Sequence, residues 1–411
     1  MRILVSDYSG HPFQVQLSRT LAARGYNLRH VSSASFQTPK GRLNRSQGDP
    51  ASFSSVTVRS RAVFAKDRFL KRRKQEIEIG QRIAEQIEEF RPDIVISSNA
   101  PLDTQLRIQR AAKKTGARFI FWVQDLYGEA IYRILRQKLG TVGSLIGSAY
   151  QRLEARLLRS SDHVVVIAPE FASAVSAMTG IENSRISVVE NWAPLDELRQ
   201  SVRENAWAVA NLPESPFRAI YSGTLGFKHN PQLLLALARG IKGDVIVMSE
   251  GPAADKLKQD AAEKGIANLH VAGWLPFDVL PEALAGADLL IVILEADAGA
   301  FSVPSKVLTY MCVGRPILGA IPASNLAARI IQQSGAGKIV DPDDELAFVA
   351  AAARMAADAA DRDARGVAAR TYAERTFDIN AIADKFEHII SVQRSRQMAH
   401  ELEHEREMQN V

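Results

Sequence analysis

Short apolar runs alternate with amphipathic stretches of helical spacing along the chain, and the amphipathic stretches end at Gly or before Pro. This pattern predicts strands alternating with helices, and therefore mostly parallel sheets covered by helices on both faces. The expected strands cover residues 3–6, 28–31, 94–97, 119–123, 164–167, 186–189, 218–222, 245–249, 269–272, 289–294, 317–320 and 337–340. The expected helices cover residues 13–24, 75–90, 103–115, 144–160, 170–178, 231–239, 253–264, 276–285, 305–313, 325–334, 345–358 and 379–392.

The alternation runs through the chain twice, and residues 205–216 between the two halves contain two prolines and no periodicity, as a linker does. We therefore expect an α/β protein with a Rossmann-like, doubly wound domain over residues 1–204 and another over residues 205–378. The helix in the stretch 379–411 is expected to pack back on the first domain. In open parallel sheets of this kind, ligands bind at the carboxyl ends of the strands, so we expect the two domains to face a cleft.

Composition places the chain among globular proteins. It has 411 residues, of which 46% are hydrophobic and 24% charged. No apolar run approaches the ~20 residues that span a bilayer, and the start of the chain does not resemble a secretory signal. Cys312 is the single cysteine, which excludes an intramolecular disulfide and fits a reducing cytoplasm. Its apolar neighbours predict a small core residue.

Positive charge is concentrated between Lys66 and Lys74, where six of nine residues are basic. Phe69 and Leu70 are interleaved with these charges. Such a segment is attracted to an anionic membrane surface, where apolar side chains can enter the interface. The alternative is a solvated helix face. We expect no nucleic-acid partner, because no recognisable nucleic-acid-binding motif accompanies the cluster.

Residues 298–316 join an expected strand to a helix that begins near Pro304 and Ser305. Ser305 is a possible helix cap, and Lys306 adds a cation beside the free backbone N–H groups of the helix start. That arrangement suits a phosphate group. The alternative is an ordinary capped helix between two strands.

Other loops of the second half also follow expected strands. SGTLGFKHNP contains Gly223, Lys228 and His229, which combine close backbone approach with positive or hydrogen-bonding groups. SEGP contains Gly251. In the next loop, Trp274 and Leu275 are candidates to receive a flat base, although a Trp packed under the sheet is the alternative.

Fewer candidates occur in the first half. Gly10 and His11 follow the first strand, and Gln124 and Asp125 follow the strand at 119–123. His11 is a candidate base or acceptor-binding group, Asp125 a group that orients a hydroxyl, and a structural role is the alternative for His11. We find no Gly-x-Gly-x-x-Gly after the first strand, no Walker A loop, no Gly-x-Ser-x-Gly and no clustered Cys/His spacing.

Seven segments, taken in order, resemble glycosyltransferase family 4. They are SDYSGHPF, VQDLYGE, VVENW, SGTLGFKHNP, SEGP, GWL and VPSKVLTYMCVGRPI. The resemblance covers nearly the whole chain, and it is strongest to the bacterial surface-polysaccharide branch. It implies the GT-B fold and a nucleotide-sugar donor, favouring UDP, that is held mainly by the second domain. No metal and no further cofactor are expected.

Carried over motif by motif, the resemblance assigns expected roles to residues of this chain. The expected donor-binding residues are Gly10, Gly223, Thr224, Lys228, His229, Gly251, Trp274, Leu275, Ser305 and Lys306. The expected catalytic residues are Lys228, Asp125, Gln124 and His11. A shift of the alignment by one position exchanges Lys228 and His229, so the basic residue that meets the diphosphate stays open.

One departure from the family pattern concerns a pair of glutamates separated by seven residues. The equivalent positions fall near Phe301 and Thr309, and neither is acidic. The second glutamate normally holds the ribose of the donor. Glu295 and Asp297, just upstream, are possible substitutes.

The expected function is the transfer of an N-acetylated or deoxy sugar to a lipid-linked or saccharide acceptor, with retention of the anomeric configuration. The expected acceptor is linked to polyprenyl diphosphate. The expected location is the cytoplasm, with peripheral contact to the inner face of the membrane through residues 66–74. Two alternatives remain open, a nucleotide-sugar 2-epimerase of the same fold and a non-catalytic nucleotide-sugar-binding protein.

Overall fold

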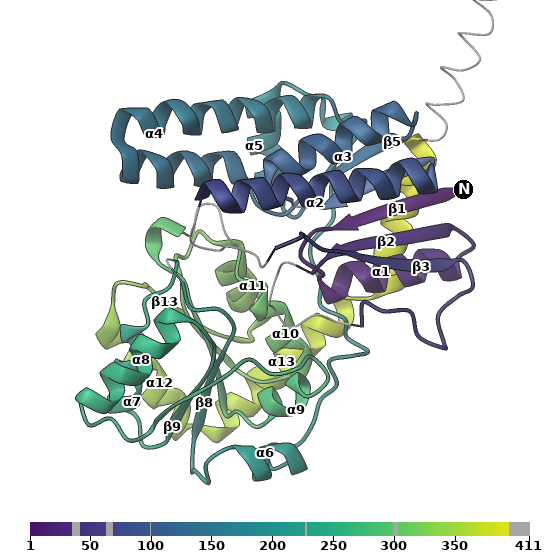
Figure 1. Ribbon diagram of the computed structural model, residues 1–411. Coiled ribbons are helices and arrows are strands. Elements are labelled where there is room, and N and C mark those ends of the chain that lie inside the picture. The colour runs from purple at the N-terminus through teal and green to yellow at the C-terminus, as the bar shows by residue number, and fades with distance from the viewer. Residues whose placement is uncertain (35–41, 63–68, 99, 227, 299–302, 394–411) are drawn as a thin grey trace, which may run out of the picture. The chain divides into compact units, whose positions relative to one another are not determined.

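The chain forms two units, each with its own parallel sheet and hydrophobic core (Figure 1). The computed structural model describes residues 1–34, 42–62, 69–98, 100–226, 228–298 and 303–393. Unit 1 comprises Met1–Glu190 and Ile379–Val411, and unit 2 comprises Asn191–Asp378. Two Rossmann-like parallel-sheet domains were predicted, and the two sheets confirm that fold class.

The sheet of unit 1 has seven parallel strands in the order β3-β2-β1-β4-β5-β6-β7. The strands are β1 (Arg2–Asp7), β2 (Asn27–Ser33), β3 (Phe53–Val58), β4 (Ile94–Ser98), β5 (Arg118–Val123), β6 (His163–Val166) and β7 (Ile186–Val188). The order reverses direction between β1 and β4, so the loop after β1 lies at the switch point of the sheet. The prediction missed β3. Its sequence, FSSVTV, is half polar, which an edge strand tolerates because only part of it is buried.

Helices cover this sheet, and α2 packs on α3, which in turn packs on α4. They are α1 (Pro12–Ala23), α2 (Phe69–Phe90), α3 (Leu102–Lys114), α4 (Tyr127–Arg159), α5 (Pro169–Thr179), the 3-10 turn η1 (Asn183–Arg185) and a helix over residues 379–393. The prediction placed a helix only over residues 144–160. In the structure α4 begins at Tyr127, and Gly140 breaks it into two arms.

The last described helix belongs to unit 1 although it follows unit 2 in the sequence. The Phe386 ring centroid lies 5.0 Å from that of the buried Trp122 ring, and Arg24, the residue after α1, forms ion pairs with Asp384 and Glu387. This helix therefore supplies part of the core and of the polar surface of unit 1.

The sheet of unit 2 has six parallel strands in the order β10-β9-β8-β11-β12-β13. They are β8 (Arg218–Ser222), β9 (Asp244–Met248), β10 (Leu269–Ala272), β11 (Leu289–Ile293), β12 (Ile317–Ala320) and β13 (Gly337–Val340). The helices are α6 (Ala206–Asn211), α7 (Gln232–Gly240), α8 (Pro252–Glu263), α9 (Leu280–Ala285), the 3-10 turn η2 (Ala296–Ala298), α10 (Lys306–Val313), α11 (Leu326–Ser334), α12 (Glu345–Ala357) and α13 (Ala359–Thr376). The strand order reverses between β8 and β11, which is the switch point of this sheet. Cys312 is fully buried in α10, as predicted.

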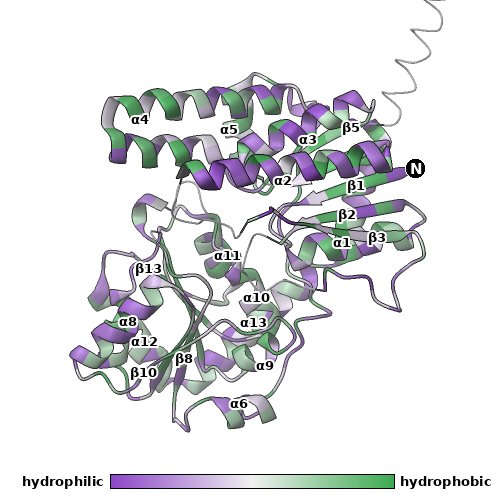
Figure 2. Ribbon diagram, in the orientation of Figure 1, coloured by the Kyte–Doolittle hydropathy of each residue, from purple (hydrophilic) through white to green (hydrophobic). Residues whose placement is uncertain are grey.

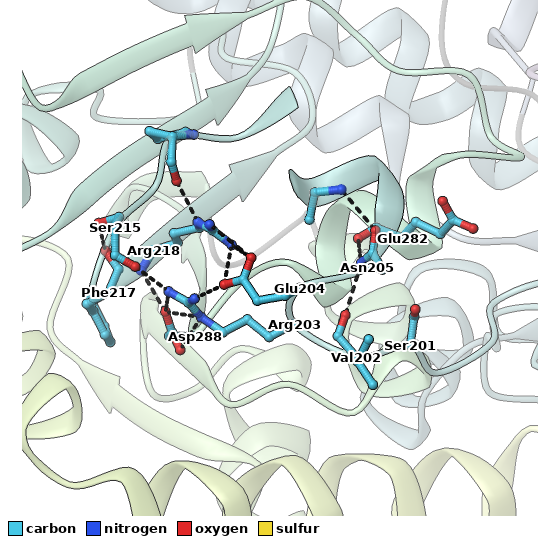
Figure 3. A network of polar contacts seen from close by, with 12 residues as sticks. Ser201, Val202, Arg203, Glu204, Asn205, Ser215, Phe217, Arg218, Glu282 and Asp288 are labelled. Atoms are coloured by element: carbon cyan, nitrogen blue, oxygen red, sulfur yellow. Dashed lines mark hydrogen bonds and ion pairs between the residues drawn. The ribbon is translucent and has the colours of Figure 1, made fainter. Parts of the chain in front are cut away.

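The segment expected to be a linker is anchored in unit 2. Arg203 donates to both carboxylate oxygens of Asp288, and the Arg218 N–H donates to the same carboxylate (Figure 3). Asn205 caps α6, which stands where no helix was expected, by accepting from the Ala208 N–H at 2.9 Å. The two units divide between residues 190 and 191, whereas the expected boundary lies between residues 204 and 205.

No helix among the described residues is both long and apolar enough to cross a membrane.

We expect Asp288→Asn to destabilise unit 2, because the partly buried Arg203 guanidinium then keeps only the exposed Glu204 as a carboxylate partner. Losing charge-assisted hydrogen bonds costs about 2 kcal/mol, which lowers the melting temperature of a unit of this size by about 4–8 °C. Scanning calorimetry measures the shift. Asp278→Asn, at an exposed carboxylate of the same unit, is the control, and an equal shift in both variants would show that Asp288 does not anchor the segment.

Candidate functional site

The loops that follow β8 and β9 are tied together by hydrogen bonds. The Gly223 N–H donates to the Met248 carbonyl at 3.0 Å, and the Leu225 N–H donates to the Ser249 hydroxyl at 3.2 Å. Gly223 has a φ of 128°, a conformation that favours glycine. The first turn of this loop is therefore fixed at the switch point of the sheet.

The loops that follow β9 and β10 are tied by Glu250. Its carboxylate accepts from the Trp274 N–H at 3.0 Å, and Gly251 adopts a φ of 102° where α8 begins. Trp274 and Leu275 are half-buried, so Trp274 is not packed wholly under the sheet. Contact of these two side chains with a base stays a prediction.

Lys306, the first residue of α10, has a buried ammonium group. Its Nζ lies 3.5 Å from the centroid of the Tyr221 ring and has no hydrogen-bond partner among the described residues. A Cβ at Gly223 would lie 3.0 Å from this Nζ, so the glycine gives the ammonium room beside the loop. Burial lowers the pKa of Lys306 well below its usual value. An anion next to this group would replace the water that it has lost.

Two tyrosines hold the surroundings of Lys306 in place. The Tyr310 hydroxyl accepts from the Ser222 N–H at 2.9 Å and donates to the Ser222 carbonyl at 3.2 Å, which joins α10 to the end of β8. The Tyr221 hydroxyl donates to the Thr224 carbonyl at 2.8 Å. The buried rings thus link the strand, the loop and the helix around the ammonium.

His229 reaches the same cluster from the other end of the loop. Its Nδ1 accepts from the Gly226 N–H at 3.1 Å, and its ring lies edge-on to Tyr221 with 6.5 Å between centroids. Burial, followed by the positive charge of Lys306, lowers the pKa of His229 to about 4. The ring is therefore neutral at physiological pH, with its proton on Nε2.

Lys228 lies close enough to His229 to help lower its pKa. The Lys228 carbonyl accepts from the Glu295 N–H at 2.9 Å, which ties the loop to the end of β11. Glu295 and Asp297 are exposed, and their contact with a ribose stays a prediction. Thr309 lies on α10, whereas Phe301 lies outside the described residues.

Ser305 does not cap α10 with its side chain, contrary to the sequence interpretation. Its own backbone is already helical, with φ −61° and ψ −22°, and a capping side chain needs an extended residue at that position. The Ser305 hydroxyl is thus not used in capping, and the side chain is exposed.

In unit 1 the loop after β1 is organised by Asp7, a buried carboxylate that the sequence analysis did not single out. It accepts from the N–H groups of Gly10 and His11, and Nδ1 of His11 lies 3.1 Å from its Oδ1. His30 lies 3.7 Å away on the other side. Burial alone would raise the pKa of Asp7, but the attraction of His11 and the hydrogen bonds outweigh burial and lower it. Asp7 is therefore ionised and fixes the orientation of the half-exposed His11 ring.

Gln124 and Asp125 follow β5 and are half-buried. Burial, and to a smaller extent the charge of Asp125, raises the pKa of nearby Glu154 to about 7. Both candidates stand at the same edge of the sheet as His11, because β1 and β5 are parallel strands separated by β4.

Of the predicted residues of unit 2, Gly223 and His229 lie beside Lys306. Gly251, Trp274 and Leu275 lie in the loops that follow β9 and β10. Tyr221 and Tyr310 were missed because a tyrosine in an apolar run looks like any other core residue. Asp7 could have been found from its place at the end of a strand, just before a glycine loop. Among the described residues, no group of three His, Cys, Asp or Glu side chains is arranged to hold a metal ion.

Comparison with known proteins identifies two domain families. The model of the Glycosyl transferase 4-like domain matches residues 11–192, and the model of the Glycosyl transferases group 1 domain matches residues 217–358. The chain is 25% identical over 63% of its length to the probable glycosyltransferase WbjE of Pseudomonas aeruginosa, and this match spans 64% of WbjE. It is 22% identical over 72% of its length to the putative colanic acid biosynthesis glycosyl transferase WcaI of Escherichia coli K12, and this match spans 73% of WcaI.

Solved structures share the fold at low sequence identity. Sucrose-phosphate synthase from Thermosynechococcus elongatus matches with a TM-score of 0.75 and 14% identity, covering 96% of this chain and 100% of that one. Anabaena HepE, solved in complex with UDP-glucose, matches with a TM-score of 0.68 and 14% identity, covering 95% of this chain and 100% of that one. With both domain families matched in order along the chain, this protein belongs to the family 4-like glycosyltransferases of the GT-B fold.

Proposed function

We propose that this protein transfers a sugar, N-acetylated or deoxy, from UDP to an acceptor in the synthesis of a bacterial surface polysaccharide. The observation that carries the proposal is the buried ammonium of Lys306, which lies beside Gly223 at the carboxyl edge of the unit 2 sheet. The UDP-glucose in HepE and the colanic acid biosynthesis in the name of WcaI support this choice of donor and pathway class.

In the proposed reaction, the donor diphosphate lies against Lys306. As the bond from the anomeric carbon to the diphosphate breaks, negative charge develops on the departing oxygen. The ammonium of Lys306 and the Nε2–H of His229 stabilise that charge, with Lys228 adjacent. His229 is suited to donate, because its Nδ1 is already occupied by the Gly226 N–H.

Unit 1 would act on the acceptor. Because the ionised Asp7 can only accept, Nδ1 of His11 is the donor in their contact, and Nε2 is the ring nitrogen that remains to meet the acceptor. Such a nitrogen can take the proton of an attacking hydroxyl. Gln124 and Asp125 would orient the acceptor sugar. We also propose that the reaction retains the anomeric configuration, as the family resemblance implies.

The proposed acceptor is a sugar linked to polyprenyl diphosphate, which places the enzyme in the cytoplasm at the inner face of the membrane. Acidic neighbours balance part of the positive charge in the described part of the segment from Lys66 to Lys74. Of its described residues, Arg72 pairs with Glu76 at 2.7 Å, and Arg73 pairs with Asp103 at 2.8 Å. Residues 66–68 lie outside the described part of the chain.

We expect UDP to raise the melting temperature of the protein, as a ligand of the native state does. Lys306→Met should weaken UDP binding by about 10–100-fold in calorimetric titration, since charge-assisted hydrogen bonds to the phosphates are lost. The free variant should melt no lower than the parent protein, because a buried amino group without a hydrogen-bond partner among the described residues is replaced by an apolar side chain. Lys242→Met, at an exposed lysine of unit 2, should behave as the parent protein does.

Unchanged UDP affinity in Lys306→Met would remove this residue from the site. UDP binding without turnover on any acceptor would instead favour a non-catalytic binding protein. That alternative is motivated by Thr309, which stands near a position where the family pattern has a glutamate. Release of a 2-epimer of the donor sugar without an acceptor would identify an epimerase.

We expect UDP binding to take up a proton. Burial depresses the pKa of Lys306 in the free protein, and the charge of the diphosphate raises it again in the complex. Affinity should therefore fall as the pH rises through the depressed pKa. The measurement is titration between about pH 7.5 and 9, where the UDP phosphates stay ionised, in buffers of different ionisation enthalpy. Proton uptake that persists unchanged in Lys306→Met would contradict the assignment.

A further inference from the structure

The helix α4 of unit 1 is a hairpin with two closely packed arms. Gly140, at φ 57° and ψ −129°, breaks the helix, and the arms run antiparallel on either side of it (Figure 1). A Cβ at Gly143 would lie 1.9 Å from the Leu135 carbonyl oxygen, and a Cβ at Gly147 would lie 2.6 Å from the Tyr132 Cα. Glycines therefore allow the two backbones to approach directly.

Several large apolar side chains near the turn are not covered by the opposite arm. Hydrophobic residues occur on both arms (Figure 2). Five of those near the turn are 38 to 74% exposed, whereas Leu135 is buried. The exposed residues are Ile134, Leu139, Val142, Leu145 and Ile146. Val142, Leu145 and Ile146 follow the spacing i, i+3, i+4 and so share one face of the second arm. Nearer the sheet, by contrast, Leu157 and Leu158 are buried in the core of unit 1.

The apolar turn is bordered by positive charge and lacks negative charge. Residues 130–153 contain four basic residues and no Asp or Glu. Arg136 and Lys138, next to Leu139, are exposed. Two copies of the hairpin placed tip to tip would bring these like charges together. Anionic lipid headgroups above an apolar layer complement both the charge and the hydrophobic residues.

The first turn of α2 lies beside the same hairpin. Arg73 donates from Nε to the hydroxyl of Tyr150, on the second arm of α4, at 3.0 Å. Leu70 and Lys71, which lie within one helical turn before Arg73, are exposed. Two elements of unit 1 thus present apolar and basic side chains near one another.

We propose that the tip of the α4 hairpin, residues 134–146, inserts into the interface of an anionic lipid bilayer. Leu139, Val142, Leu145 and Ile146 enter the boundary of the acyl chains, and Arg136 and Lys138 contact the phosphate groups above them. The insertion goes beyond the transfer reaction and does not depend on donor binding.

The test is sedimentation of the full chain with vesicles of phosphatidylcholine and phosphatidylglycerol, and with vesicles of phosphatidylcholine alone. The protein should bind the mixed vesicles more tightly. The triple variant Leu139→Ser, Val142→Ser, Leu145→Ser should bind them about 100-fold more weakly, because three apolar side chains no longer leave water. The matched control carries Val209→Ser, Leu346→Ser and Val367→Ser at exposed sites of unit 2, and it should bind as the parent protein does.

A label measures insertion directly, since the single natural cysteine, Cys312, is buried and poorly accessible to reagents. An environment-sensitive dye on Leu145→Cys should shift to the blue with mixed vesicles, whereas the same dye on Leu346→Cys should not. Failure of the parent protein to bind mixed vesicles, or equal binding by the triple variant, would overturn the proposal. So would a blue shift that depends on protein concentration without lipid, which would assign the tip to a second copy of the chain. The UDP-induced rise in melting temperature, measured without vesicles on the triple variant, shows that the variant is folded and tests donor binding separately.

Discussion

An ammonium group held away from water is the constraint around which the site of unit 2 is arranged. A desolvated cation costs free energy unless its surroundings compensate. For Lys306 the face of the Tyr221 ring supplies part of that compensation, at 3.5 Å. The missing side chain of Gly223 leaves the ammonium its space, and Tyr310 fixes the helix that carries it. Among the residues that the structure describes, this ammonium has no hydrogen-bond partner, so the proposed diphosphate would contact the same residues that shape the loop.

The corresponding position in unit 1 carries the opposite charge. The loop after β1 and the loop after β8 both stand where the strand order of their sheet reverses. The first surrounds the carboxylate of Asp7, and the second surrounds the ammonium of Lys306. A carboxylate that orients an imidazole suits work on a hydroxyl, and a cation suits a departing phosphate. Two sheets of one topology thus differ in chemistry through a few residues in equivalent loops.

Much of this arrangement could be predicted from the sequence. Apolar runs predicted every strand except β3, and the glycine and lysine of the unit 2 site were each singled out as phosphate contacts. Their proximity was not predictable, because it depends on which strands are neighbours. The role of Tyr221 was hidden by its apolar context. The first arm of α4 was missed because its exposed Ile134 and Leu139 and its basic residues do not follow the pattern of a helix that packs on a sheet.

The return of the last helix to unit 1 has a consequence for synthesis on the ribosome. Phe386 completes the packing around Trp122, so the unit that emerges first cannot finish its core until the end of the chain is made. Unit 2, although encoded later, has all its strands available before then. Amino-terminal domains usually fold first during synthesis. Here the amino-terminal unit can complete its core only after unit 2 has been synthesised. Until that step, an incomplete unit 1 would expose its apolar surface to chaperones and proteases.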